Sequence, residues 1–499
     1  MGIHARSPVN LSHITFRTPP EIFGIIFSHV TEGDLFQASQ VCQYWRSVLT
    51  SFASLWTRIS TAYGPQAIAS LERCGPLPIR LRIDEPFPSR VLEKVLFLGN
   101  KIASLNAMLL APQISRLQQL LELSRPSMER LIFQCYAGYF RRNEDQTMRD
   151  IEQDFPRLRE LFIAEHSISI HKLTAPNLVH LVLEHTGRKQ NVTVQTILDM
   201  LRRFPLLETL LLNYEEDVHH APAHCDSVRL PHLRSIEVGP WEVHSGLITN
   251  LDFPPDVAVG FQSIYQGDLL DPVPDMLLDS MRHVLKRVKI RSITLAEYHW
   301  DAYFLIRYEG LRGYLEITAS LNMYLHPKDS MDYLFGARGL LLSSSPHIED
   351  VTEMHIVGCI FKTHRGLEHV KETMQNVDAI SFFRCEGAHP FVLLTSENTS
   401  SPPFPRLERV MVLGDELGLE EMAKNRRDLG VPLKTLILGR DQEDFKHDRL
   451  EDYATLEGLV GDLRIDCPVE IVEWGARNEI VDVWSAAGAS DPVSLNRAH

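Results

Sequence analysis

The sequence has no long apolar run: none of its 499 residues belongs to a stretch approaching the roughly 18 uncharged apolar residues needed to span a bilayer. Its first residues, MGIHARSPVNLSH, lack the apolar core of about 7–15 residues that a secretory signal requires. Basic residues are also fewer than acidic ones, with 50 Lys and Arg against 65 Asp and Glu. We therefore expect a soluble, acidic, intracellular protein of the cytoplasm and/or nucleus, with neither membrane nor nucleic acid among its partners.

Cysteine is sparse as well. The seven cysteines are scattered, odd in number and never form a CxxC pair, which favours buried thiols in a reducing compartment over a disulfide framework. Phosphate-binding loops, GxSxG, HExxH and dinucleotide-binding glycines are missing too. The expectation is a non-catalytic protein with no cofactor and no bound metal.

One segment carries ligand types that suit Zn²⁺, residues 219–226 (HHAPAHCD). The donors crowd into one stretch and lack the spacing of a zinc finger, so a polar loop is the favoured interpretation.

The acid is concentrated at the C-terminal end, where residues 440–499 hold fourteen acidic and six basic residues. Apolar residues recur there at helical spacing; they are Phe445, Leu450, Tyr453, Leu456, Leu459 and Leu463. The pattern predicts an acidic cap or tail with a solvated helix face, and the alternative is an acidic surface that attracts a basic partner.

The first sixty residues predict three short helical elements. Thr18, Pro19 and Glu21 have the order of a helix N-cap and capping box. Ile22, Ile25 and Ile26 then follow on one face. So small a head buries little surface by itself, so its apolar stripe needs a partner, either the rest of the chain or another protein.

Asp34 has the position of an N-cap for a second helix, and Ser54-Leu55-Trp56 forms a third short element. The second helix presents one apolar face, made of Leu35, Ala38, Val41, Cys42, Trp45 and Leu49.

The segment TPPEIFGIIFSHVTEGDLFQASQVCQYWRSVLTSFASLWTRI (18–59) resembles the F-box, whose pattern runs LPxEILxxIFSxLxxxDLxxASxVCRxWRxxAxxxxLWxxI. The VCxxWR core followed by LW at this spacing carries the resemblance, and Thr18, Phe23 and Gln43 depart from it. The resemblance implies docking on the Skp-type adaptor of an SCF (Skp, cullin, F-box) ubiquitin ligase.

The resemblance also implies an adaptor interface, made of Pro19, Ile22, Ile25, Ile26, Leu35, Val41, Cys42, Trp45, Leu55 and Trp56. The alternative for some of them, especially Val41 and Trp45, is that they hold the helices together.

Beyond the head, the phrase Pro-x-Leu-x-x-apolar-x-apolar recurs, and its first four prolines are spaced by 20, 29 and 26 residues. These steps lie within or near the leucine-rich-repeat range of about 20–29. The copies are FPRLRELFI (155–163), APNLVHLVL (175–183), FPLLETLLL (204–212), LPHLRSIEV (230–238) and FPRLERVMV (404–412), with a shifted VPLKTLIL (431–438) and weaker forms at 127–133, 351–357 and 377–383.

Each copy predicts a strand with alternate residues inward, and QTILDMLRRFP (195–205) predicts a return helix. The fold class is thus α/β, a three-helix F-box followed by an irregular leucine-rich-repeat-like αβ solenoid; unrelated βα units are the alternative. The expected domains are an F-box (14–60), a connecting helix or linker (61–75), the solenoid (76–439) and the acidic cap or tail (440–499). Residues 250–345 do not fit the phrase.

The whole layout resembles F-box proteins with a divergent leucine-rich-repeat C-terminal domain, particularly those of basidiomycete fungi. LERCGPLPIRLRID (71–84) fits this resemblance, which implies a helix ending near Cys74-Gly75 that leads into a first strand.

In such a solenoid, the residues between the inward positions face the concave surface. The predicted substrate-binding column is Phe162, Val182, Leu211, Glu237, Met411 and Ile437. Flanking it are Glu160, His180, Thr209, Ser235, Arg409 and Thr435. Five of the six central residues are apolar, which is typical of a binding surface; the alternative is that the C-terminal segment or the 240–270 loops cover them.

These resemblances imply a substrate-recognition subunit of an SCF-type ubiquitin ligase. Its partners would be a Skp-type adaptor, a cullin reached through it, and a protein substrate that the sequence does not identify. The alternative is an F-box-containing interaction scaffold that acts outside ubiquitination.

Overall fold

The structure is a computed structural model, and it describes residues 18–84, 89–109, 114–135, 149–150, 153–164, 168–184, 193–213, 226–239, 246–264, 275–298, 301–309, 313–320, 348–357, 360–361, 370–383, 385–387, 390–395, 402–413, 418–439 and 454–466. The chain is mixed α/β and divides into two compact units. Unit 1 comprises residues 1–289, 305–322 and 343–346, and unit 2 comprises residues 290–304, 323–342 and 347–499.

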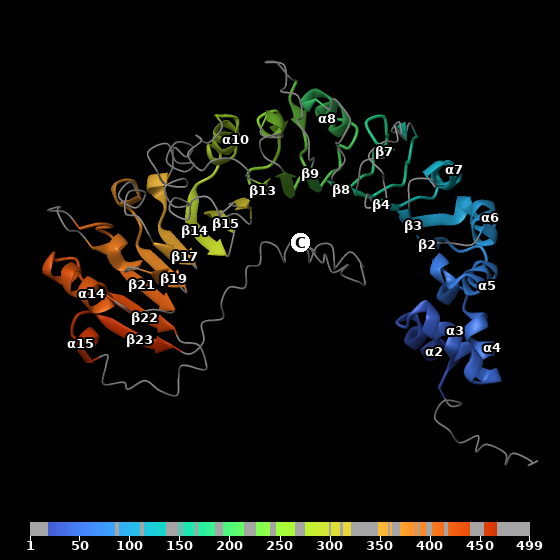
Figure 1. The fold of residues 1–499 in the computed structure, drawn as a ribbon, viewed down its shortest axis with the longest axis horizontal. Coiled ribbons are helices and arrows are strands. Elements are labelled where there is room, and N and C mark those ends of the chain that lie inside the picture. The colour runs from blue at the N-terminus through green and yellow to red at the C-terminus, as the bar shows by residue number, and fades with distance from the viewer. Residues whose placement is uncertain are drawn as a thin grey trace, which may run out of the picture. The chain divides into compact units, whose positions relative to one another are not determined.

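Unit 1 begins with a helical head and continues as alternating strands and helices (Figure 1). The helices are α2 (Pro20–Ser28), α3 (Glu32–Val41), α4 (Gln43–Ser51), η1 (Ala53–Trp56), η2 (Thr61–Tyr63), α5 (Pro65–Arg73), α6 (Ser89–Phe97), η3 (Gly99–Lys101), α7 (Ile114–Ser124), α8 (Val194–Leu201) and α10 (Asp275–Leu285). The strands are β1 (Arg58–Ser60), β2 (Ile79–Ile83), β3 (Ile102–Leu109), β4 (Arg130–Cys135), β5 (Arg149–Asp150), β6 (Glu160–Ala164), β7 (Ile168–Ser169), β8 (His180–Glu184), β9 (Thr209–Asn213), β10 (Val228–Arg229), β11 (Ser235–Gly239), β12 (Leu251–Asp252), β13 (Ala258–Ile264) and β16 (Tyr314–Ser320).

The caps of the head differ from the prediction. Helix α2 starts at Pro20 with Pro19 as its N-cap, and no side chain caps it, so the predicted cap at Thr18 is wrong by one residue. Helix α3 is capped by Thr31, whose Oγ1 accepts a hydrogen bond from the Asp34 amide at 3.2 Å and donates one to Asp34 Oδ2 at 2.7 Å. Asp34 is therefore the third residue of the capping arrangement and not the cap itself.

The predicted second helix is in fact two helices. Cys42 is extended (φ −155°, ψ 167°) and breaks the chain between α3 and α4. Its Sγ accepts a hydrogen bond from the Trp45 amide at 3.4 Å and so caps α4. This break turns α4 back across α2, which places Trp45 against that helix.

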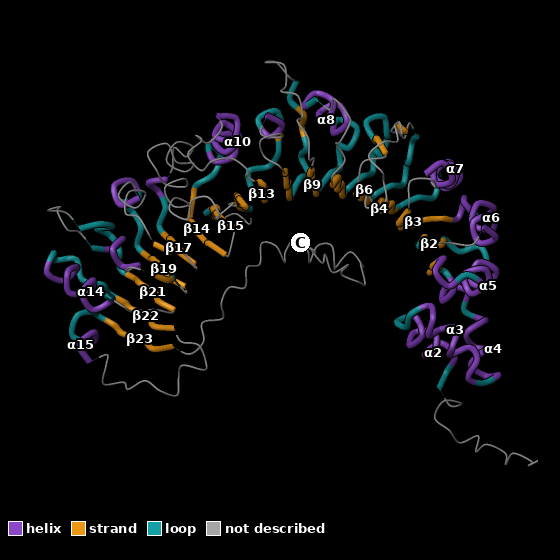
Figure 2. The backbone as a smooth tube through the Cα atoms, in the orientation of Figure 1, coloured by secondary structure: helices purple, strands orange, loops and turns teal. Residues whose placement is uncertain are grey.

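The described pairings of the main sheet of unit 1 are parallel and follow chain order as far as β13, which then pairs with β16, past β14 (Ile290–Tyr298) and β15 (Asp301–Tyr308) in the chain. Strand β1 pairs with β2, and the pairing continues through β3, β4, β6, β8, β9, β11, β13 and β16. Helices α5 to α8 and α10 lie on one side of these strands, and the described residues place no helix on the other side, which we call the helix-free face (Figure 2).

The recurring Pro-x-Leu phrase begins with a β-turn. In each copy the Leu amide donates to the carbonyl of the residue before Pro, at 3.2 Å for Leu158, 3.0 Å for Leu178, 3.2 Å for Leu207 and 3.2 Å for Leu233. Proline suits the second position of such a turn because its φ is already fixed there. The turn then delivers the chain into the next strand in register.

A ladder of leucine side chains seals the helix-covered side of the sheet. Leu105, Leu131, Leu161, Leu181 and Leu210 are partners across successive strands, and each is at most 1% exposed. The predicted return helix is confirmed as α8, and its inward residues Ile197, Leu198 and Leu201 are fully buried together with Phe204. This burial is the main stabilising contribution to unit 1.

The described residues of unit 2 form a second run of parallel strand pairings. Strand β14 (Ile290–Tyr298) pairs with β17 (Glu353–Val357), and the order continues through β19 (Ala379–Phe383), β21 (Arg409–Leu413), β22 (Thr435–Gly439) and β23 (Asp462–Asp466). Its other elements are η6 (Ile348–Asp350), β18 (Ile360–Phe361), β20 (Glu386–Gly387), η7 (Pro390–Leu394), α14 (Leu419–Asp428) and α15 (Ala454–Glu457). Strand β15 (Asp301–Tyr308) is divided between the two units.

The predicted helical spacing of the acidic C-terminal segment holds only in part. Leu456 lies in the short helix α15 and is 5% exposed, but Leu463 lies in β23 and pairs with Leu436 of β22. The sheet of unit 2 thus extends past residue 440. Phe445, Leu450 and Tyr453 lie outside the described residues.

The region that the phrase did not fit, 250–345, contributes β13 and β16 to unit 1 and β14 to unit 2. In the described part of the chain, no helix is both long enough and apolar enough to cross a membrane.

Candidate functional site

Helix α2 is apolar on two sides, and its inner side forms an aromatic cluster. Phe23 and Phe27, one turn apart, are 6% and 8% exposed. Their ring centroids lie 5.8 and 5.3 Å from that of Trp45 on α4, within the range of favourable aromatic packing. Trp45 keeps intermediate exposure, so one part of its ring packs inside the head while the rest remains accessible.

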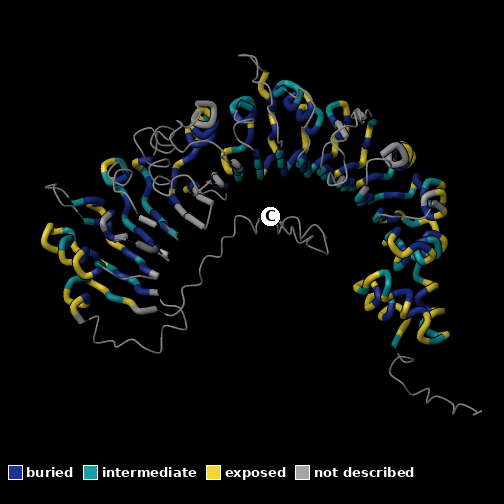
Figure 3. The backbone as a smooth tube through the Cα atoms, viewed as in Figure 1, coloured by how far each residue is buried: buried dark blue, intermediate teal, exposed yellow. Residues whose placement is uncertain are grey.

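The outer side of α2 carries three isoleucines that nothing in the described chain covers. Ile22, Ile25 and Ile26 are 45%, 59% and 51% exposed, and Val41 at the end of α3 is 65% exposed. The exposed positions of the head are visible in Figure 3. Contiguous exposed apolar side chains mark a binding surface, because burying them in a partner is worth about 1 kcal/mol or more each.

Two of the predicted adaptor contacts lie inside the protein, and for them the prediction is wrong. Leu35 is 3% exposed and Trp56 is fully buried. The Trp56 indole Nε1 donates to the Leu49 carbonyl at 2.9 Å, its ring meets Phe36 edge-on at 5.0 Å, and the Arg73 guanidinium lies 4.4 Å from its centroid. Trp56 therefore ties α4 and α3 to α5 and has no surface to offer a partner.

The remaining predicted contacts have at least part of their surface open. Pro19 is exposed, and Cys42 and Leu55 are half-buried. An open hollow of about 430 Å³ lies beside the break between α3 and α4, lined by Cys42, Gln43, Tyr44 and Ser47. Val41 is too exposed to hold the helices together, whereas Trp45 does pack against α2.

A polar seam joins the head to the first strands. The Glu32 carboxylate of α3 accepts a hydrogen bond from the Ser60 amide of β1 at 2.6 Å and one from Ser70 Oγ of α5 at 3.4 Å. Burial is the largest influence on this carboxyl and raises its pKa from 4.5 to about 7, against the lowering effect of the two hydrogen bonds. Ser60 Oγ also donates to Asp84 Oδ2 at 2.9 Å.

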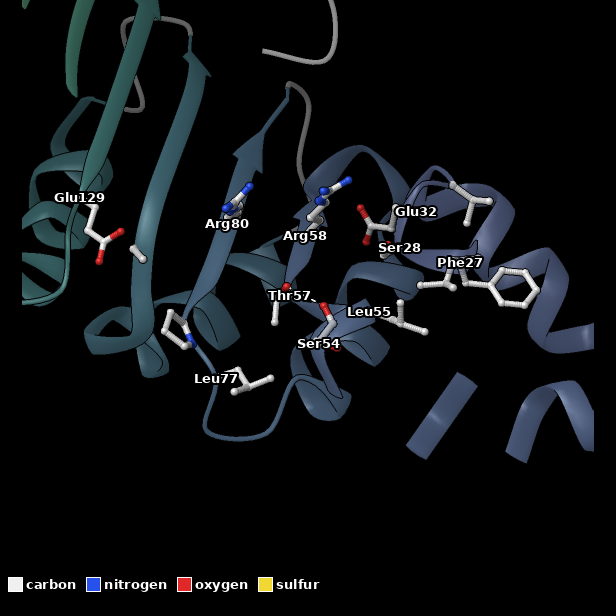
Figure 4. Close-up of a pocket in the computed structure, with 14 residues that line it drawn as sticks. Phe27, Ser28, Glu32, Ser54, Leu55, Thr57, Arg58, Leu77, Arg80 and Glu129 are labelled. Carbon is white, nitrogen blue, oxygen red and sulfur yellow. Dashed lines mark hydrogen bonds between the residues drawn. The ribbon is translucent and has the colours of Figure 1, made fainter. Parts of the chain in front are cut away.

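This seam leaves a cavity of about 430 Å³ between the head and strands β1 to β3 (Figure 4). Phe27, Ser28 and Leu55 line it from the head, and Arg58 and Arg80 line it from β1 and β2. The sheet thus begins at β1, directly after the LW pair, and the predicted boundary at residue 76 falls after its first strand.

The predicted substrate-binding residues form a true column in unit 1. Phe162, Val182, Leu211 and Glu237 are direct partners across β6, β8, β9 and β11, on the helix-free face. Phe162, Leu211 and Glu237 are half-buried, but Val182 is only 2% exposed and offers almost no surface. Met411 and Ile437 are partners of each other in unit 2, and both are half-buried.

The residues that flank the column are charged or polar. Glu160 is the register partner of Arg130 and of His180, and it forms an ion pair with Arg130 at 2.9 Å. Thr209 is buried, and Ser235 is half-buried. In unit 2, Thr435 is half-buried and Arg409 is exposed and paired with Asp378 at 3.1 Å. Burial lowers the pKa of His180 below its ordinary value.

Sequence reasoning missed the residues that close the head. Phe23 and Phe27 are spaced one turn apart, which could have revealed a second apolar side of α2. Nothing local could have revealed Glu32 or Arg73, because their partners are 28 and 17 residues away in the chain.

The described residues hold no group of three or more His, Cys, Asp or Glu side chains able to bind a metal ion. Of the metal candidate 219–226, all but Asp226 lies outside the described residues. The alternative covers for the predicted column, the segment after residue 466 and parts of the 240–270 loops, also lie outside them.

Comparison with family models identifies an F-box-like domain at residues 19–62. These residues span the head, β1 and the beginning of η2. The match supports the classification of the chain as an F-box protein, and domains of this class generally bind Skp-type adaptors. A comparison with curated proteins finds no match to the chain.

Proposed function

We propose that the chain is the non-catalytic substrate-recognition subunit of an SCF-type ubiquitin ligase. The F-box-like head docks on a Skp-type adaptor, which connects it to a cullin. The sheets that follow the head in the chain capture a target protein. One observation carries the proposal: three isoleucines on the outer side of α2 stay exposed although the same helix buries Phe23 and Phe27.

The proposal includes a leucine-rich-repeat-like solenoid of the type found in divergent fungal F-box proteins. Parallel strands in chain order, each preceded in the clearest copies by the same proline turn, support it in both units. A doubly wound sheet would reverse its strand order at a switch point, whereas the pairings from β1 to β13 and from β17 to β23 keep one direction.

The seam between α3 and β1 supports a receptor in which the head and the first strands move as one body. Glu32, Ser60, Ser70 and Asp84 join three elements through hydrogen bonds, and Trp56 joins three through packing. A ligase of this kind acts by position, because it raises the effective concentration of the target lysine at the ubiquitin thioester.

Co-purification with adaptor and cullin tests the proposal. Wild type should recover both, and Ile22→Asp with Ile25→Asp should recover neither while it keeps its melting temperature. The matched control is Leu206→Asp, which changes another exposed apolar residue (41% exposed) outside the F-box-like domain. Recovery of the adaptor without a cullin favours the alternative, a scaffold that acts outside ubiquitination.

Target capture is tested separately on the helix-free face of unit 1. Phe162→Asp and Leu211→Asp place a charge at half-buried positions, and we expect each to abolish capture and leave the adaptor bound. Val182→Asp is unsuitable, because a charge at a 2% exposed position destabilises the fold. Unchanged capture by both folded variants would remove the column as the binding surface.

A further inference from the structure

Among the described residues, two arginines at the start of the main sheet have no ion-pair partner. Arg58 of β1 and Arg80 of β2 are direct register partners on adjacent parallel strands, and both are exposed. In the described part of the chain, neither guanidinium forms an ion pair or hydrogen bond. Figure 4 shows both side chains pointing the same way above the cavity that they line.

The two acidic residues of the same cavity form no ion pair with these arginines among the described residues. Glu32 points its carboxylate at Ser60 and Ser70, and Glu129 forms no ion pair with Arg80. Ser54 and Thr57 also line the cavity, and the Thr57 hydroxyl donates to the Ser54 carbonyl at 2.8 Å. The lining thus holds two arginines and two glutamates, and it is the two guanidinium groups that remain available to a carboxylate from outside, with the Ser54 side chain beside them.

The next arginines along the same face are already paired. Arg82 binds Asp84 at 2.9 Å, and Arg130 binds Glu160 at 2.9 Å. Unpaired positive charge is thus concentrated at Arg58 and Arg80. Further along the sheet the face becomes apolar, with Ile132 and Phe162 as register partners on β4 and β6.

The distance from the strand that carries Arg80 to the strand that carries Phe162 sets the length of a peptide that could contact both. Three strand steps separate β2 from β6, which at about 4.8 Å per step is about 14 Å. An extended peptide covers this distance in about four residues at roughly 3.3 Å per residue.

We propose that the helix-free face of unit 1 binds an extended acidic segment of the target protein. Asp or Glu side chains of the segment contact Arg58 and Arg80, and an apolar side chain about four residues away packs on Ile132 and Phe162. This inference rests on the proposed function, since it names the class of target segment that the receptor takes. Guanidinium–carboxylate pairs supply orientation, and the apolar contact adds affinity.

Fluorescence anisotropy on the full chain tests the inference with short labelled peptides. The probe carries two glutamates, a Gly/Ser spacer of about four residues and a leucine pair, in both chain directions. We expect one of them to bind, and binding to weaken about tenfold in the Arg58→Gln/Arg80→Gln variant, the loss of about 1.4 kcal/mol expected for charge-assisted hydrogen bonds. Added salt should weaken wild type more than the variant.

The matched control is Arg229→Gln, which removes an exposed arginine of β10, a strand outside the main sheet. It should bind like wild type, and a lysine peptide in place of the glutamate peptide should not bind. Failure of both glutamate peptides, equal binding to the double variant, or equal binding of the lysine peptide would overturn the inference.

Adaptor recovery by the same proteins keeps the two proposals apart. The double variant should still recover the adaptor, because its substitutions leave the isoleucines of α2 untouched. If wild type recovers the adaptor but the peptide results fail, the inference is lost and the proposed function stands. If wild type recovers no adaptor, the proposed function is lost whatever the peptides do.

Discussion

The outer side of α2 and the helix-covered side of the main sheet both carry aliphatic side chains, but these side chains are exposed on α2 and buried in the sheet. Leu131, Leu161 and Leu181 are closed over by helices and neighbouring strands, and none is more than 1% exposed. Ile22, Ile25 and Ile26 are about half exposed. The difference shows that apolar content alone does not mark a binding surface; what marks it is apolar content that the chain leaves uncovered.

Trp56→Ala should have the largest effect, because it opens the sealed region at the point where the head meets the sheet. We expect a loss of about 4 kcal/mol in the free energy of unfolding, from the cavity and from the lost hydrogen bond and cation–π contact. Denaturant unfolding measures it. Phe97→Ala, at an 84% exposed position, is the control and should change stability by less than about 0.5 kcal/mol. Equal effects would contradict the burial of Trp56.

Two neighbouring residues of β6 allow the same comparison between a buried and a half-buried apolar side chain. Leu161→Ala removes a fully buried ladder residue and should cost about 3 kcal/mol in unfolding free energy. Phe162→Ala, on the opposite and half-buried side, should cost about 1 kcal/mol. Thermal unfolding of both variants compares the two losses of unfolding free energy. A larger loss for Phe162→Ala would mean that the Phe162 side of the sheet is the covered one.

Glu32 makes the closed seam dependent on pH. Because its folded pKa is raised from 4.5 to about 7, the folded protein holds a proton that the unfolded chain releases between these two values. Stability gained from this group is fully present below about pH 4.5 and falls as pH rises through about 7. The change should be about 2 kcal/mol after allowance for partial solvent screening.

Glu32→Gln keeps the size of the side chain and removes the titration. Unfolding free energies measured from pH 5 to pH 8 should show a smaller fall for this variant than for wild type. Glu349→Gln, which changes a carboxylate in unit 2, should follow the wild-type curve. A Glu32→Gln curve that coincides with wild type would show that Glu32 titrates normally.

Ile25→Ala should have the smallest effect on the fold and a measurable one on binding. The residue is 59% exposed, so unfolding free energy should change by less than about 0.5 kcal/mol. Adaptor affinity should fall about tenfold, the loss of about 1.4 kcal/mol expected for truncating an interface residue. Calorimetric titration with purified adaptor measures it, and unchanged affinity would place the docking surface elsewhere.

The repeating part of the fold could be predicted from the sequence because its rule is local. Each proline turn precedes a strand, and two-residue alternation puts Leu161 and Ile163 on the side opposite to Phe162, as their burial shows. The same local logic failed at the ends of helices. Cys42 breaks a helix that the apolar spacing continues, because its sulfur caps α4.

The candidate site could be predicted only in part, for the same reason. Helical spacing places Ile22, Ile25 and Ile26 on one side, but it does not say whether another segment covers them. Trp56 and Leu35 have the same apolar character, and both are closed in by parts of the chain that follow them or lie beside them in the fold.

By itself, the sequence determined the helical head and the turn-and-strand phrase, since helical spacing, turn chemistry and two-residue alternation act over a few residues. The tertiary structure decided which apolar side chains were covered, which arginines kept a free charge and which carboxyl was buried in the seam. Those outcomes depend on segments far apart in the chain meeting in space, and a local pattern does not contain that information.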